Sequence, residues 1–164
     1  MAYVISNDQI QRGAQRFARL LDAAGVHRSG TVALLLPNVP EFLYCYRGSG
    51  WSGRTSVLVN RNLKSPDIVY VRENSGAQVL VAHVDYRESA QAAAVGLDRR
   101  HCFAVGGDIP GFRRLEEMNA FSDAPLDEPV AGSLMLYTSG TSGKPKGVIS
   151  RGLQIGRASC RERV

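Results

Sequence analysis

Apolar positions recur at helical spacing near the start of the chain. Ser6 and Gln9 stand three positions apart, which is the sequence signature of a helix capping box. Helically spaced apolar side chains then follow at Ile10, Ala14, Phe17, Leu21 and Ala24. This pattern predicts a helix over about residues 7–24 that ends at Gly25, because glycine is the commonest residue just past a helix.

Short apolar runs alternate with further helical patterns along the rest of the chain. A helix is expected to begin at Pro40, another at Ser65, and an alanine-rich helix near Tyr86–Val95. The apolar runs are Thr31–Leu36, Thr55–Val59, Gln78–Ala82, His101–Val105 and Ser133–Tyr137. Runs of this kind are typical of strands covered on both faces. The alternation of strand and helix therefore predicts an α/β fold with a mostly parallel sheet and flanking helices.

The most informative segment follows the last apolar run. Residues 138–147 read TSGTSGKPKG and lead into the apolar pair Val148-Ile149, so we expect a loop held between two strands. Glycines let the backbone approach an anion closely and expose its N–H groups. The hydroxyl groups can donate hydrogen bonds, and Lys144 and Lys146 supply positive charge. Such a loop is suited to a polyphosphate.

Other interpretations of this loop have less support. It is not a Walker phosphate loop, because no Gly-Lys-Ser/Thr follows Gly140 in register. A flexible Gly/Ser linker is disfavoured, since linkers are rarely anchored by an apolar strand or stiffened by Lys-Pro-Lys. A serine hydrolase is disfavoured too, because neither Ser52 nor Ser139 has the flanking glycines of a nucleophile elbow.

The segment LYTSGTSGKPKGV resembles the signature loop of the adenylate-forming superfamily, which includes acyl-CoA synthetases, peptide-synthetase adenylation domains and luciferases. Ser142 stands where the family usually has threonine. The segments GVHRSGTVALLLPNVPEF and VLVNRNLKSPDIVYVRENSGAQVLV are also similar to early units of this family, and they favour acyl-CoA synthetases. The resemblance covers about residues 7–153. It implies that this fold is the incomplete N-terminal part of the large adenylate-forming domain.

The resemblance also implies an activity. Enzymes of this family join a carboxylic acid to AMP at the expense of ATP, and a thiol, usually of coenzyme A, then displaces AMP. ATP, Mg²⁺ and coenzyme A are therefore the expected cofactors, and a small carboxylic acid, by resemblance a fatty acid, is the expected substrate. The residues expected to bind the ATP phosphates are Thr138, Ser139, Gly140, Thr141, Ser142, Gly143, Lys144 and Lys146.

The family's adenine-binding segment, ribose-binding aspartate, domain hinge and catalytic lysine would lie beyond residue 153. We therefore assign no catalytic residue and expect the chain by itself to be inactive and prone to aggregate. Two alternatives stay open. One is an adenylation domain that loads a carrier protein, and the other is a non-catalytic module that binds the phosphates of ATP.

Composition narrows the class of protein. Apolar residues make up 44% and charged residues 21%, which is a globular balance. No apolar run approaches the roughly 20 residues that cross a bilayer, and the N-terminus has no signal or transit pattern. We expect a cytoplasmic protein, with peripheral membrane association left open. The net charge is +5, but the basic residues are spread along the chain and lack interleaved aromatic residues. Nucleic acid is therefore not an expected partner.

Cysteine and histidine are equally uninformative about metals. The cysteines are odd in number and widely spaced, which fits neither a disulfide framework nor a metal-ligand pattern. The histidines are scattered in the same way. The residues concerned are Cys45, Cys102, Cys160, His27, His83 and His101. We therefore expect reduced thiols and no metal site built from protein side chains.

The last residues of the chain differ from the rest. The decapeptide IGRASCRERV shows no helical or strand pattern and carries three arginines and a cysteine. The codons ATC GGA AGA GCG TCG TGT AGG GAA AGA GTG encode it and resemble a common sequencing-library adapter, and Gln154 fits through a codon ending in AG. A natural basic tail is the alternative. We therefore divide the chain into residues 1–153, the fragment of the AMP-binding domain, and residues 154–164, an expected non-native tail.

Overall fold

A computed structural model describes residues 3–139 and 143–151 of the chain. Its centre is a seven-stranded sheet in the order β5-β4-β3-β1-β2-β6-β7. The strands are β1 (Thr31–Leu35), β2 (Thr55–Leu58), β3 (Val79–His83), β4 (Cys102–Val105), β5 (Arg113–Arg114), β6 (Ser133–Thr138) and β7 (Lys146–Arg151). All neighbouring strands run parallel except β6 and β7, which are antiparallel.

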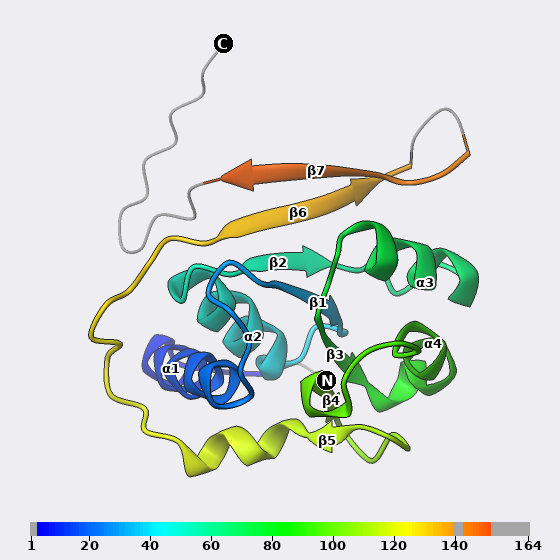
Figure 1. The fold of residues 1–164 in the computed structure, drawn as a ribbon. Helices are drawn as coiled ribbons and strands as arrows, with labels where there is room; N and C mark the ends of the chain where they lie inside the picture. The colour runs from blue at the N-terminus through cyan, green and yellow to red at the C-terminus, as the bar shows by residue number, and fades with distance from the viewer. Residues whose placement is uncertain (1–2, 140–142, 152–164) are drawn as a thin grey trace.

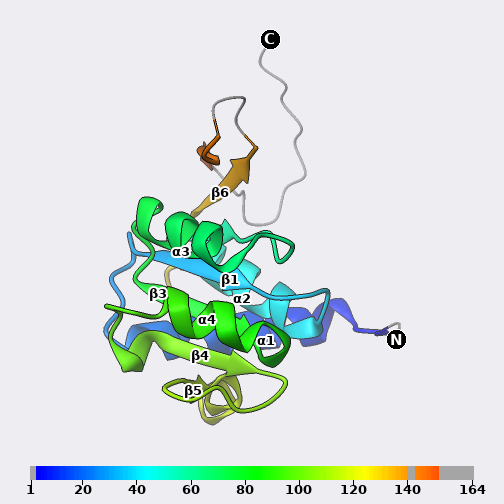
Figure 2. The ribbon, with the colours of Figure 1, turned by 90° about the vertical axis from the view of Figure 1, so that its right-hand side faces the viewer.

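Helices cover both faces of the central strands. Helices α1 (Asn7–Ala23) and α2 (Pro40–Trp51) lie on one face, and α3 (Ser65–Asn74) and α4 (Arg87–Ala93) lie on the other (Figure 1). Short 3₁₀ turns complete the connections: η1 (Val84–Tyr86), η2 (Arg99–His101) and η3 (Leu115–Ala120). Viewed from the side of α3 and α4, the hairpin of β6 and β7 lies at one end of the molecule, next to α3 (Figure 2). The predicted α/β fold with a mostly parallel sheet and flanking helices is confirmed.

The alternation of side chains along each strand builds two cores. On β1, Val32 and Leu34 belong to the core beneath α1 and α2, whereas Ala33 and Leu35 belong to the core beneath α3 and α4. Successive side chains of a strand point to opposite faces, so a strand that is apolar throughout must be covered on both. The short apolar runs of the central strands are therefore buried on both faces, as their sequence predicts.

The start of the first helix agrees closely with its sequence signature. The Ser6 hydroxyl accepts a hydrogen bond from the backbone N–H of Gln9, and the Gln9 side chain accepts one from the backbone N–H of Ser6, at 3.1 and 2.9 Å. Two N–H groups that the helix cannot satisfy itself are thereby paired. Gly25 follows the helix with φ +77°, a left-handed conformation that favours glycine.

Some elements differ from the expectation. Strand β1 ends at Leu35 rather than Leu36, and His101 belongs to the turn η2 rather than to β4. Strand β5 has no apolar pattern, because it consists of two arginines that pair with Phe103 and Ala104 of β4. The guanidinium of Arg113 lies 5.2 Å from the centre of the Phe103 ring, within the range of a cation–π contact, so β5 is also joined to β4 by this side chain.

Candidate functional site

Strand β6 leads into the glycine-rich loop at the carboxyl edge of the parallel strands. Since β6 is parallel to β2, and β2 to β1, Thr138 emerges at the same edge as the carboxyl ends of those strands. The arrows of β2 and β6 point the same way, and that of β7 points back (Figure 1). In open α/β sheets, ligands bind outside the carboxyl ends of the strands. The loop therefore lies where this architecture places ligand sites.

The register of the hairpin fixes the two arms of the loop. Thr138 lies opposite Lys146, and Tyr137 lies opposite Gly147, so residues 139–145 connect the strands. The predicted arrangement of a loop between two strands is confirmed at both arms. Of the predicted phosphate-binding residues, Thr138, Ser139, Gly143, Lys144 and Lys146 are described. Gly140, Thr141 and Ser142 lie outside the described residues.

The geometry of the hairpin favours glycine at two positions. Gly143 has φ +92°, a left-handed conformation in which a side chain would strain the backbone. At Gly147, a Cβ atom would stand 3.0 Å from Cζ of Tyr137, which is closer than side-chain carbons normally approach. Glycine at position 147 thus leaves room for the Tyr137 ring beside β7.

The side chains on the arms of the loop are open to solvent. Thr138, Ser139, Lys144 and Lys146 are all exposed. In the part of the chain that the structure describes, no acidic side chain forms a salt bridge with either lysine. The hairpin therefore presents positive charge that is not neutralised by a described carboxylate, together with hydroxyl donors. This combination fits an anionic ligand such as a polyphosphate.

Helix α3 contacts both arms of the loop, which the sequence did not reveal. The Tyr137 hydroxyl donates a hydrogen bond of 2.8 Å to Oδ1 of Asn74. Nζ of Lys144 lies 5.1 Å from the centre of the Tyr70 ring. Tyr70 and Asn74 are four positions apart on a helix, which places them on one face. That spacing is visible in the sequence, but nothing local indicates which segment packs against it.

Burial raises the pKa of the Tyr137 hydroxyl, and the nearby Tyr70 raises it further. The hydroxyl therefore keeps its proton at neutral pH and can act as the donor to Asn74.

Among the described residues, no group of three His, Cys, Asp or Glu side chains is arranged to hold a metal ion. Cys45 and Cys102 are free thiols, and both are buried. No described helix is both long and apolar enough to cross a membrane.

Comparison with known proteins identifies the family of the chain. The model of the family described as "AMP-binding enzyme" matches residues 3–155. A crotonobetaine/carnitine--CoA ligase of Salmonella enteritidis PT4 (strain P125109) is 31% identical over 160 residues, covering 90% of this chain and 30% of that protein. A feruloyl-CoA synthase of an Amycolatopsis species is 33% identical over 144 residues, covering 86% of this chain and 27% of that protein. The chain thus spans about 30% of the length of these relatives.

Solved structures of similar fold are also CoA ligases. An anthranilate CoA ligase in complex with anthranoyl-AMP superimposes with a TM-score of 0.76 at 24% identity, over 87% of this chain and 29% of the other. A fatty acyl CoA synthetase of Mycobacterium tuberculosis gives a TM-score of 0.72 at 25% identity, over 90% and 29%. The likeness to the anthranilate CoA ligase shows the fold. The family match, over residues 3–155, covers nearly all of the chain. The chain therefore belongs to the AMP-binding family of adenylate-forming enzymes, with acyl-CoA ligases among its relatives.

Proposed function

We propose that this chain supplies the phosphate-binding part of an enzyme that activates a carboxylic acid with ATP and transfers the acyl group to coenzyme A. The observation that carries the proposal is the β6–β7 hairpin. It presents Lys144 and Lys146, without a described carboxylate partner, beside the carboxyl edge of a parallel sheet. The relatives named as CoA ligases support the type of reaction.

The residues of the loop have distinct proposed roles. The hydroxyls of Thr138, Ser139, Thr141 and Ser142 would donate hydrogen bonds to the β- and γ-phosphates. Lys144 and Lys146 would offset their charge, and Gly140 and Gly143 would let the backbone approach the phosphates. Donors and cations held in place before the reaction stabilise the charge that develops on the departing pyrophosphate. Bound Mg²⁺ would neutralise further phosphate charge, held mainly by phosphate oxygens and water. We assign no catalytic residue to this chain.

A fatty acid is the proposed substrate, and the cytoplasm is the proposed compartment, with peripheral contact to a membrane as the alternative. The relatives act, by their names, on different acids, among them crotonobetaine or carnitine and ferulate. The acceptor is proposed to be coenzyme A rather than a carrier protein, because the named relatives are CoA ligases.

We also propose that residues 1–153 are a fragment of the AMP-binding domain and that residues 154–164 are a non-native tail. Amplifying the source DNA across codons 145–175 without library adapters tests this. We expect the reading frame to differ from IGRASCRERV after Leu153 and to continue with codons for a ribose-binding aspartate and a late lysine. A genomic frame that encodes the decapeptide and then stops would contradict the division.

The activity is tested by pyrophosphate release from ATP in the presence of fatty, aromatic and short-chain carboxylic acids. We expect the longer protein encoded by that DNA to release pyrophosphate with at least one acid and to form the CoA thioester. The present chain is expected to release none. The longer protein with both Lys144→Met and Lys146→Met is the matched control, expected to lose most activity. Turnover by the 164-residue chain would overturn the view that it is inactive.

A further inference from the structure

Both arms of the phosphate-binding hairpin touch the same face of helix α3. Tyr137, just before the loop, donates its hydroxyl to Asn74, and Lys144, near the end of the loop, places its ammonium over Tyr70. The distance of 5.1 Å from Nζ to the ring centre lies within the range of about 6 Å for a cation–π contact. The Tyr137 bond keeps the hairpin against α3, so that the ring of Tyr70 lies within reach of the lysine.

Tyr70 is well suited to hold a flexible side chain. It is half-buried and packs against the core beneath α3 and α4, so its ring has a fixed place. Lys144 is exposed, and no described carboxylate competes for its ammonium group. A free lysine side chain loses about 1.5–2 kcal/mol of conformational freedom when it is fixed. A lysine already held on a ring has less freedom to lose when an anion binds.

We propose that Tyr70 is a positioning residue for Lys144. Its ring holds the ammonium beside the second arm of the loop, so that the charge is in place before a polyphosphate arrives. The use of this charge rests on the proposed function, whereas the contact itself does not. Tyr70 itself touches no phosphate, and it acts only through Lys144.

The contact can be tested without any ligand. The chain has three lysines, so Lys64 and Lys146 serve as internal references in an NMR spectrum. Protons above an aromatic ring resonate upfield, and we expect the side-chain methylene signals of Lys144 to be shifted upfield relative to those of Lys64. The shift should disappear in Tyr70→Leu and persist in Tyr70→Phe, which keeps the ring. Its absence from the unmodified chain, or its persistence in Tyr70→Leu, would overturn the inference.

The consequence for binding is tested by calorimetry with inorganic tripolyphosphate at low salt. We expect Tyr70→Leu to weaken binding about 2- to 5-fold, the range for an exposed cation–π contact, and Tyr70→Phe to leave it unchanged. In a Lys144→Met background, Tyr70→Leu should have no further effect. An equal loss of affinity with and without Lys144 would show that Tyr70 merely supports the fold. Tighter binding by Tyr70→Leu would show that the ring keeps the lysine away from the anion. Either result refutes the positioning role.

These two readouts separate this inference from the function on which it rests. An unmodified chain that shows the upfield shift but binds no tripolyphosphate contradicts the proposed phosphate site, and with it the use of Lys144 in binding. A chain that binds tripolyphosphate without the shift supports the phosphate site and overturns the role of Tyr70. Unfolding midpoints of all variants, measured in urea, establish that each one is folded.

Discussion

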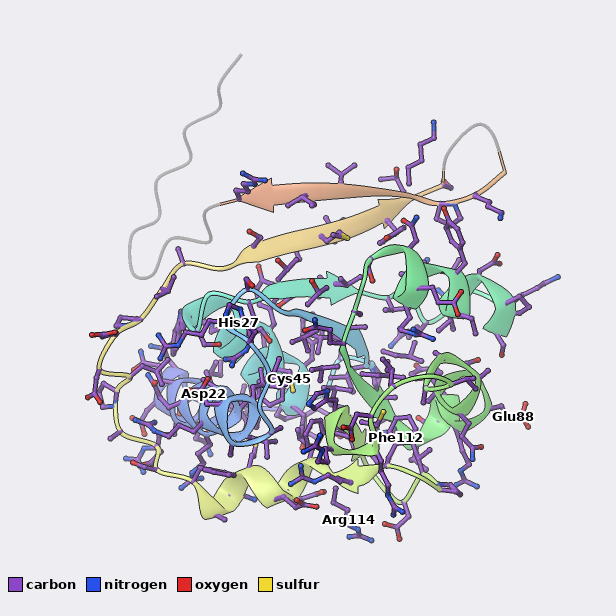
Figure 3. The ribbon with its side chains drawn as sticks, viewed as in Figure 1. Asp22, His27, Cys45, Glu88, Phe112 and Arg114 are labelled. Carbon is purple, nitrogen blue, oxygen red and sulfur yellow. The ribbon has the colours of Figure 1, made fainter. Side chains whose placement is uncertain are left out.

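The guanidinium of Arg54, which has no exposed surface, donates a hydrogen bond of 2.6 Å to Oδ1 of Asp22. Arg54 also donates to the backbone carbonyl of Val26 and to the hydroxyl of Ser52. These partners belong to the end of α1, the loop after it and the end of α2, and Figure 3 marks Asp22 on α1. One buried cation therefore joins three segments at the amino end of β2.

Replacing Arg54 should destabilise the chain strongly. Removing one member of a buried, hydrogen-bonded ion pair typically costs about 3–5 kcal/mol. We expect Arg54→Met to cost about 3 kcal/mol, the low end of that range, because the Asp22 side chain is 40% exposed and can be hydrated. The free energy of unfolding in urea, followed by circular dichroism, measures the loss.

Arg12→Met is the matched control for that experiment. The Arg12 side chain is 59% exposed, pairs with Asp8 on the same helix and lies 3.9 Å from Asp123. Exposed ion pairs of this kind contribute about 1 kcal/mol or less. If Arg54→Met lowered the free energy of unfolding no more than Arg12→Met does, the structural role of Arg54 would be refuted.

The bond between Tyr137 and Asn74 should contribute to stability as a pair. A hydrogen bond of this kind adds about 1 kcal/mol net, so Tyr137→Phe and Asn74→Ala should each lower the free energy of unfolding by up to that amount. Because both changes remove the same bond, the double variant should lose little more than either single one. Losses that simply add would mean that the two side chains do not interact in solution.

The buried thiols should be unreactive in the folded chain. Burial raises the pKa of Cys102 to about 11, with a smaller contribution from Asp98, and burial also raises the pKa of Cys45. Figure 3 shows Cys45 in the interior. Since the thiolate is the reactive form, we expect a Cys160→Ser variant at pH 8 to react with a disulfide reagent only after unfolding in urea. Rapid labelling of the folded variant at both positions would contradict this.

Local sequence signals predicted the elements whose pattern is self-contained. The capping box of Ser6 and Gln9 and the apolar strands could be recognised because a short stretch of sequence determines them. Strand β5 could not, because Arg113 and Arg114 form a strand only through pairing with β4. The burial of Arg54 depends on acceptors from distant segments. Arginine alone in a sequence favours the surface.

Some residues of the candidate site could likewise be predicted from the sequence, and others could not. The phosphate-binding residues were predicted from the motif, and the structure describes both arms of their loop between β6 and β7. The partners Tyr70 and Asn74 were not predicted, because they lie on a helix far from the loop in sequence and meet it only in the folded sheet. Their role as loop partners could be recognised only once the order of strands was known.

Binding of Mg-ATP to the ¹⁵N-labelled chain tests the central claim most directly. We expect amide signals of Thr138, Ser139, Gly143, Lys144 and Lys146 to shift and to saturate with added nucleotide. These shifts should be lost in a chain carrying Lys144→Met and Lys146→Met, with the remaining spectrum unchanged. Shifts confined to another basic segment, such as Arg113–Arg114, or no saturable shift at the hairpin, would contradict the claim that this loop binds the phosphates of ATP.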